Sequence, residues 1–186
     1  MGKVKGFKSQ IPNALTLFRI ILIPLFIYFA IKEYYPASLL VFIIASLTDT
    51  FDGIIARKFK YVSSFGKIFD PLADKVLVAS ALIILTLWGL IYWWLTLLIL
   101  ARELFMTLLR NHLIKRKIYL AANIFGKIKT TAQMSTIIFS LFYRSFLPKS
   151  SVIENIILIA FILVTIITWL SAIIYIFQIR KEIYAK

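Results

Sequence analysis

The sequence has no cysteine and only one histidine, His112. The absence of cysteine excludes disulfide bonds and thiol-based metal or redox centres, and a lone histidine cannot form a zinc site by itself. Acidic residues are also few: 8 aspartates and glutamates stand against 22 lysines and arginines, so the formal net charge is +14. A catalytic base, or a ligand for a hard cation, must therefore come from a small set of carboxylates.

Apolar residues are abundant instead, and they make up 61% of the 186 residues. They form several runs that are long enough to cross a bilayer as helices. The pattern predicts an all-α polytopic integral membrane protein with a single domain over 1–186 and a basic N-terminal segment over 1–10. Pro12 and Asn13 are expected to open the first span, with Asn13 as its cap. Six transmembrane helices are expected, at about 15–31, 37–56, 70–88, 91–109, 124–142 and 153–177.

The basic residues indicate how these spans are oriented. Sixteen fall on the side of the two termini, whereas three, Lys32, Arg144 and Lys149, fall on the other side. Cytoplasmic loops are enriched in lysine and arginine, so both termini are expected to be cytoplasmic, in a cell membrane. We expect no nucleic-acid partner, because the chain lacks a large soluble surface and attraction to anionic lipid explains the charge. Arg19, one turn inside the first span, could reach the interface by snorkelling.

All four aspartates lie within 26 residues, at positions 49, 52, 70 and 74. They adjoin long apolar runs, where carboxylates are costly and are expected to have a function. Asp49 and Asp52 are three residues apart, and Asp70 and Asp74 are four apart, so each pair shares one helix face. Two such helices can enclose a hard divalent cation such as Mg²⁺ or Mn²⁺. If the aspartates only paired with nearby lysines and arginines, four costly acids would serve no purpose.

Two groups of cations accompany the aspartates. Arg57 follows Asp52 by five residues, near the same helix face, and could bind a phosphate beside the metal. Gly53 and Ala56 keep this surface small, so a bulky ligand can approach the backbone. A second basic group comprises Arg102, Arg110, Lys127 and Lys129. A metal ion with two anion sites suggests transfer between two phosphorylated partners, with a carboxylate as the base.

The pattern Asp-x2-Asp-Gly-x2-Ala-Arg-x8-Gly-x3-Asp-x3-Asp, over residues 49–74, resembles the signature of the CDP-alcohol phosphatidyltransferases at every fixed position. The resemblance extends over essentially the whole chain, because members of that family have about this length and six spans with a cytosol-facing site. It implies that CDP-diacylglycerol donates its phosphatidyl group to an alcohol and that CMP is released. It also implies a homodimer.

The same resemblance implies a role for each matching residue. Asp49, Asp52 and Asp70 would hold one or two metal ions. Asp74 would contribute to the metal site and serve as the base. The pocket for CDP-diacylglycerol would be lined by Asn13, Asp52, Gly53, Ala56, Arg57 and Gly66.

Flanking segments such as Arg102-Glu103 and Gly126-Lys127 are most similar to family members whose acceptor is glycerol 3-phosphate. The acceptor's phosphate would then be bound by Arg102, Arg110, Lys127 and Lys129. Inositol phosphate and phosphatidylglycerol remain as alternative acceptors. Two alternatives lie outside the family. A membrane prenyltransferase would carry its acidic motifs on widely separated segments, whereas both pairs here fall within 26 residues. A cation carrier would place its acids near the middle of the bilayer, whereas the predicted spans place these at the rim.

Overall fold

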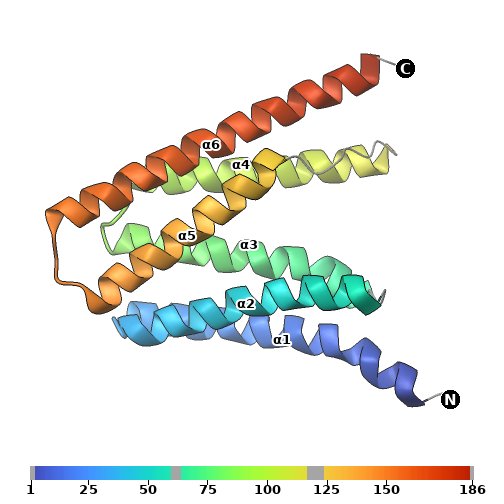
Figure 1. The fold of residues 1–186 in the computed structure, drawn as a ribbon, viewed down its shortest axis with the longest axis horizontal. Helices are drawn as coiled ribbons and strands as arrows, with labels where there is room; N and C mark the ends of the chain where they lie inside the picture. Colours follow the sequence, from blue (N-terminus) through green and yellow to red (C-terminus); the bar gives the residue numbers. More distant parts are fainter. Residues whose placement is uncertain (1–2, 60–63, 117–123, 185–186) are drawn as a thin grey trace. The chain divides into compact units, whose positions relative to one another are not determined.

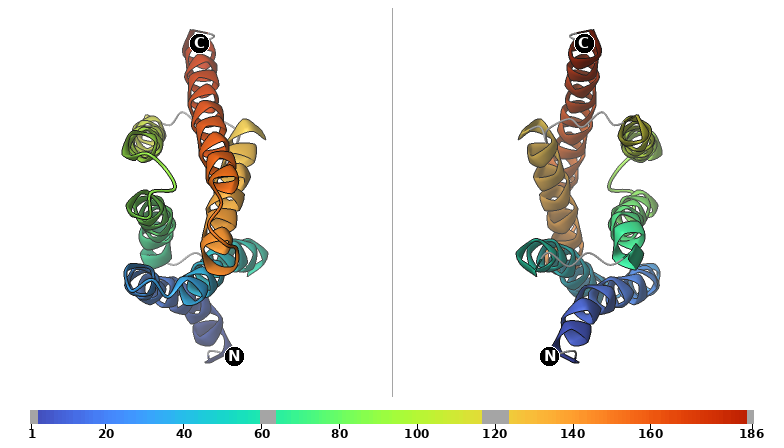
Figure 2. Two further views of the ribbon diagram at one scale, coloured as in Figure 1. Left: turned by 90° about the vertical axis from the view of Figure 1, so that its left-hand side faces the viewer. Right: turned by 90° about the vertical axis from the view of Figure 1, so that its right-hand side faces the viewer.

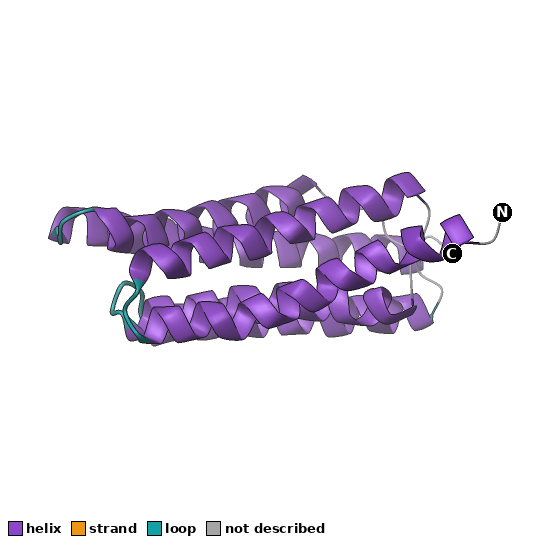
Figure 3. Cartoon of the chain, turned by 90° about the horizontal axis from the view of Figure 1, so that it is seen from below, coloured by secondary structure: helices purple, strands orange, loops and turns teal. Residues whose placement is uncertain are grey.

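The structure is a computed structural model. It describes the backbone of residues 3–59, 64–116 and 124–184, and the side chains of residues 17–48, 72–116, 126 and 128–180. Within these ranges all regular secondary structure is helical, which confirms the all-α prediction (Figures 1 and 3). The helices are α1 (Lys3–Ile31), α2 (Tyr35–Phe59), α3 (Ser64–Leu87), α4 (Trp93–Lys115), α5 (Ile124–Phe146) and α6 (Ser151–Tyr184). Each predicted span overlaps one of these helices.

Each of these helices is longer than the span predicted for it, and two expectations about their ends are wrong. α1 begins at Lys3 and passes through Pro12, so Asn13 is not its N-terminal cap. α3 begins at Ser64, six residues before the predicted start of the third span at residue 70, so Gly66 lies inside this helix. A proline inside a helix removes one backbone hydrogen bond, and the hydrogen bonds of the flanking turns can offset that cost.

The described chain divides into two compact units. The N-terminal unit comprises Met1–Ile84 together with Leu141–Pro148, and the C-terminal unit comprises Leu85–Ser140 together with Lys149–Lys186. Both α3 and α5 therefore contribute residues to each unit. The single domain over residues 1–186 stays a prediction.

In the N-terminal unit, α1 and α2 are antiparallel neighbours (Figures 1 and 2). The rings of Phe26 and Phe42 pack with their centroids 5.5 Å apart, and Ala30 and Ala45 are fully buried. Small residues such as alanine allow two helix backbones to approach closely. The contact between Phe26 and Phe42 relates the numbering of the two helices. Both helices have the same rise per residue, so a residue a given number of positions before Phe26 lies level with the residue the same number of positions after Phe42.

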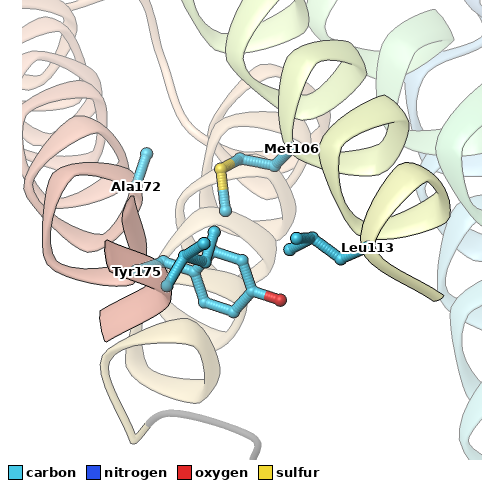
Figure 4. Packing of buried hydrophobic residues seen from close by; sticks show 5 residues of the cluster. Met106, Leu113, Ala172 and Tyr175 are labelled. Atoms are coloured by element: carbon cyan, nitrogen blue, oxygen red, sulfur yellow. The ribbon is translucent and has the colours of Figure 1, made fainter. Parts of the chain in front are cut away.

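In the C-terminal unit, α4 and α6 pack side by side and run in the same direction. A hydrogen bond joins Arg102 to Thr168, 66 residues further along the chain. Met106 and Ala172 have the same separation, as expected for parallel helices in contact. The buried apolar cluster between the two helices comprises Met106, Leu113, Ala172, Tyr175 and Ile179 (Figure 4). Burial of this cluster fixes the register of α4 against α6.

Two helix ends share one hydrogen-bonding pattern. Glu33 follows α1 with φ 59°, and Gly89 follows α3 with φ 76°. Each of these residues donates its N–H to the carbonyl three positions back, at 3.2 and 3.0 Å. The next residue donates to the carbonyl five positions back, at 2.9 and 3.0 Å. This motif ends a helix with a left-handed residue, for which glycine is preferred because it has no Cβ.

Among the described residues, Ser151–Arg180 of α6 is the helix that is long and apolar enough to cross a membrane. Shorter apolar helical segments occur at Leu17–Ile31 and Tyr35–Thr48. The described parts of α3, α4 and α5 include no segment of this length and apolarity.

Candidate active site

The four aspartates lie on two consecutive helices, as their spacing predicted. Asp49 and Asp52 lie ten and seven residues before the end of α2. Asp70 and Asp74 lie six and ten residues after the start of α3. Only residues 60–63 separate the two helices, so the facing helix ends are at most about 18 Å apart. With a rise of about 1.5 Å per residue, both pairs lie at a similar depth, about 9 to 15 Å from those ends.

Asp74 is the aspartate whose side chain the structure describes. It is half-buried, next to the buried Ala73 and one turn before Leu77, which is also buried. The side chains of Asp49, Asp52 and Asp70 lie outside the described ones. Among the described side chains, which include one aspartate of the four, no three acidic or histidine residues form a metal-binding group.

The residues predicted to bind the donor are distributed over three helices of the N-terminal unit. They are Asn13 in α1, Asp52, Gly53, Ala56 and Arg57 in α2, and Gly66 in α3. Asn13 precedes Phe26 by thirteen residues, so the antiparallel register puts it level with residue 55, thirteen beyond Phe42. It is therefore level with the glycine–alanine–arginine segment of α2. All six positions lie outside the part of the chain whose side chains the structure describes.

Arg19 is fully buried, so the interpretation that it snorkels to the interface is wrong. It precedes Phe26 by seven residues, and the same register puts it level with Asp49, seven residues beyond Phe42. A buried guanidinium is stable only with anionic or hydrogen-bonding partners. Arg19 is therefore a buried cation at the depth of the first aspartate of the motif. In the sequence, Arg19 is an arginine inside an apolar run. That pattern is equally typical of a buried residue and of an interfacial one.

In the C-terminal unit, Glu103 joins two of the four predicted acceptor-site cations. Arg102 Nε donates to the backbone carbonyl of Thr168 in α6 at 3.0 Å, and Arg102 Nη1 lies 3.4 Å from Glu103 Oε1. The Lys129 ammonium of α5 forms an ion pair with the same carboxylate oxygen. The side chains of Arg102 and Lys129 are only 7% and 8% exposed, and that of Glu103 is 20% exposed. Glu103 was not a predicted site residue, because spacing along the chain does not show which helices meet.

The other two cations of the predicted acceptor site are Arg110 of α4 and Lys127 of α5. Arg110 is exposed on α4, about two turns beyond Arg102 and so on the same side of the helix. Lys127 is in α5, and its side chain lies outside the described ones. It precedes Lys129 by two residues, and residues at that spacing do not share a helix face.

The two charged groups suit different ligands. Carboxylates at one end of the N-terminal unit are the oxygen donors that hard divalent cations prefer. A pair of cations such as Arg102 and Lys129 suits a phosphate, because charge-assisted hydrogen bonds to phosphate oxygens are strong. Together they provide the groups that a phosphoryl-transfer reaction uses.

Comparison with known proteins agrees with this chemistry. The chain matches the CDP-alcohol phosphatidyltransferase family over residues 9–177. It is 34% identical over 183 residues to the CDP-diacylglycerol–glycerol-3-phosphate 3-phosphatidyltransferase of Sodalis glossinidius, with 94% of this chain and 97% of that protein covered. The Bacillus subtilis protein of the same name is 42% identical over 140 residues, with coverages of 67% and 72%. A probable phosphatidylglycerophosphate synthase of Mycobacterium tuberculosis is 37% identical over 166 residues, with coverages of 86% and 78%.

The match covers most of the chain, and it includes the complete aspartate pattern on α2 and α3. Several relatives at 34–42% identity share one name. This chain therefore belongs to the CDP-alcohol phosphatidyltransferase family.

Proposed function

We infer that this protein is an enzyme of phospholipid biosynthesis that transfers the phosphatidyl group of CDP-diacylglycerol to glycerol 3-phosphate. The products are phosphatidylglycerophosphate and CMP. The observation that carries this inference is the complete aspartate pattern on two consecutive helices of a chain in this family. Relatives that cover most of the chain are named for the same two substrates.

A divalent metal ion fits the carboxylates present. The family generally depends on such an ion, and the four aspartates supply hard oxygen ligands at one end of the N-terminal unit. We propose that one or two ions, Mg²⁺ or Mn²⁺, are held by Asp49, Asp52, Asp70 and Asp74. Bound there, the metal would neutralise charge on the diphosphate of the donor.

Asp74 is proposed as the base. An acceptor hydroxyl loses its proton as its oxygen bonds to the phosphorus that carries the diacylglycerol, and the bond from that phosphorus to CMP breaks. Asp74 follows Asp70 by one helical turn, so it can reach the metal site without being the principal ligand. The chain has no cysteine, and its one histidine, His112, lies exposed near the end of α4. A carboxylate is therefore the group best suited to accept the proton.

The donor and acceptor would bind through different groups. The cytidine diphosphate of the donor would lie against Asn13, Asp52, Gly53, Ala56, Arg57 and Gly66, where small residues allow close approach to the helix backbone. The phosphate of glycerol 3-phosphate would be bound by Arg102, Arg110, Lys127 and Lys129. The support for this acceptor site is the buried pair of cations on α4 and α5.

We propose six membrane spans, cytoplasmic termini and a cytoplasmic active site, in a homodimer within the cell membrane. The exposure pattern of α6 supports membrane insertion. Its polar side chains Thr165, Thr168 and Ser171 are buried, whereas large apolar ones face outward. This distribution suits a lipid surrounding. The exposed apolar residues of α6 are Val152, Ile156, Ile159, Leu163, Ile166, Leu170, Ile173 and Phe177.

A direct assay tests the proposed reaction. Purified protein receives CDP-diacylglycerol, Mg²⁺ and one acceptor at a time, and CMP release is measured. We expect the highest kcat/KM with glycerol 3-phosphate, compared with inositol phosphate, serine and phosphatidylglycerol. A preference for phosphatidylglycerol would instead assign cardiolipin-type synthesis, and a preference for inositol phosphate would assign another phosphorylated acceptor. No CMP release with any acceptor would overturn the proposed function.

A further inference from the structure

Glu103 occupies a distinctive position in the C-terminal unit. It is on α4, and its Oε1 atom interacts with Arg102 of the same helix and with Lys129 of α5. Arg102 in turn donates from Nε to the backbone of Thr168 on α6. One carboxylate thus connects two cations, and one of those cations is anchored to a third helix.

The burial of these groups makes the carboxylate necessary. Arg102 and Lys129 carry like charges and are each less than one-tenth exposed. Two buried cations lose hydration and repel each other, and a shared anion offsets both effects. Glu103 supplies that anion and leaves the three groups with a net charge of about +1. A net positive charge is still favourable for a phosphate monoester, which carries about two negative charges near neutral pH.

The geometry also restricts Lys129. A lysine side chain has four carbons and many rotamers, and a ligand that binds it must first immobilise it. The contact with Glu103 fixes the ammonium before the ligand arrives, and preorganisation of this kind strengthens binding. An ammonium has three N–H donors, so a bond to Glu103 and a bond to a phosphate oxygen are compatible.

We propose that Glu103 is a positioning residue of the acceptor site: it holds Lys129 and Arg102 in a fixed arrangement that receives the phosphate of glycerol 3-phosphate. This proposal rests on the proposed function of the basic group. Glu103 acts through the two cations and does not contact the reacting atoms. Its removal therefore weakens acceptor binding and leaves donor binding unchanged.

The test uses full-length protein in detergent micelles that contain CDP-diacylglycerol and Mg²⁺. Initial rates of CMP release are measured for wild type, Glu103→Gln and the matched control Glu154→Gln, which changes a glutamate in the first turn of α6. For Glu103→Gln we expect the KM for glycerol 3-phosphate to rise about tenfold, as for loss of one charge-assisted interaction. The KM for the donor should stay within about twofold, since donor binding uses other residues. Glu154→Gln should behave as wild type.

A double variant shows whether Glu103 acts through Lys129. Once Lys129→Gln has removed the ammonium, adding Glu103→Gln should change the KM for glycerol 3-phosphate little further, because coupled residues are not additive. Additive effects would overturn the proposal.

A second variant serves if Glu103→Gln does not fold. Glu103→Asp retains the negative charge, but its side chain is shorter by one methylene, so the carboxylate lies further from Lys129 and Arg102. A raised acceptor KM in that variant supports the proposal, and an unchanged one overturns it.

Other outcomes are equally decisive. A lower acceptor KM in Glu103→Gln would mean that the carboxylate competes with the phosphate, and an equal rise in both KM values would mean that it supports the fold. Either result overturns the positioning role while the proposed reaction stands. If wild type releases no CMP with any phosphorylated acceptor, the proposed function fails first, and the role of Glu103 falls with it.

Discussion

The two charged groups of this protein are built in opposite ways. The four aspartates fall within 26 consecutive residues on α2 and α3. The group around Glu103 draws on α4, α5 and α6, and its members Arg102 and Thr168 are 66 residues apart. Helix periodicity alone places the aspartates on shared faces, whereas only packing brings Lys129 to Glu103. In the proposed function, a short motif therefore supplies the metal and donor sites, whereas the acceptor site depends on how three helices pack.

The largest effect is expected at the local motif. We predict that Asp49→Ala, Asp52→Ala and Asp70→Ala each abolish CMP release, because each removes a metal ligand and its charge. Wild-type activity should likewise disappear with a chelator and return with Mg²⁺ or Mn²⁺. Glu154→Gln, a change of an acidic residue elsewhere, should retain activity. Robust turnover by wild type in metal-free buffer would contradict the metal assignment.

The next effect separates binding from chemistry within the same motif. We predict that Asp74→Asn still binds CDP-diacylglycerol but loses kcat by roughly 10²- to 10⁴-fold, the usual contribution of a positioned base. The amide keeps the shape of the carboxylate and cannot accept the proton. Donor affinity by titration and CMP release at saturating substrates check this prediction. Near-wild-type kcat would show that the proton leaves through another group.

A smaller and more selective effect is expected at the packed group. We predict that Lys129→Ala raises the KM for glycerol 3-phosphate about ten- to a hundredfold, since a charge-assisted hydrogen bond contributes roughly 1.5–3 kcal/mol. Arg110→Ala should raise it less, because Arg110 is exposed and its charge is screened by solvent. Lys127→Ala is expected to raise the same KM. Steady-state kinetics with each substrate varied in turn check this, and equal changes in both KM values would assign these cations to the donor or the fold.

The smallest effects concern the two helix ends that share one motif. Glu33 and Gly89 both have left-handed backbones, which cost a residue with a Cβ about 1–2 kcal/mol. We predict that Gly89→Ala lowers the free energy of unfolding by about that amount, although space for the methyl group is open. Glu33→Gly should change stability in the opposite direction by up to about 1 kcal/mol. Thermal unfolding in detergent, followed by tryptophan fluorescence, checks both.

Gly126→Ala is the matched control for these changes. Gly126 lies inside α5, and a Cβ there also meets no atom within 4 Å. Alanine is the better helix former, so this substitution should stabilise the protein by about 1 kcal/mol. If Gly89→Ala were also stabilising, the left-handed backbone at that position would not be the reason for the glycine.

Local helical structure was predictable to a large extent. Apolar runs of spanning length predicted all six helices, and the spacing of Asp49 and Asp52 and of Asp70 and Asp74 predicted two shared faces on helices. Helix ends were predicted less well. Pro12 and Asn13 predicted the start of the first helix, and the third was predicted to begin at about residue 70, but α1 begins at Lys3 and α3 at Ser64. Pro12 and Gly66 therefore lie inside helices, because the cost of one unfavourable residue is small beside a long run of backbone hydrogen bonds.

The sequence by itself determined the helical class and the aspartate pattern, because both depend on interactions between residues that are close along the chain. Only the tertiary structure decided the environment of the isolated charges. The sequence is consistent with an interfacial Arg19, but in the structure, where α1 packs against α2, this side chain is fully buried. The sequence assigned no role to Glu103, and only the structure shows that it pairs with Lys129, which is 26 residues further along the chain. Burial and ion pairing depend on which helix faces meet, and side-chain packing between distant segments determines that.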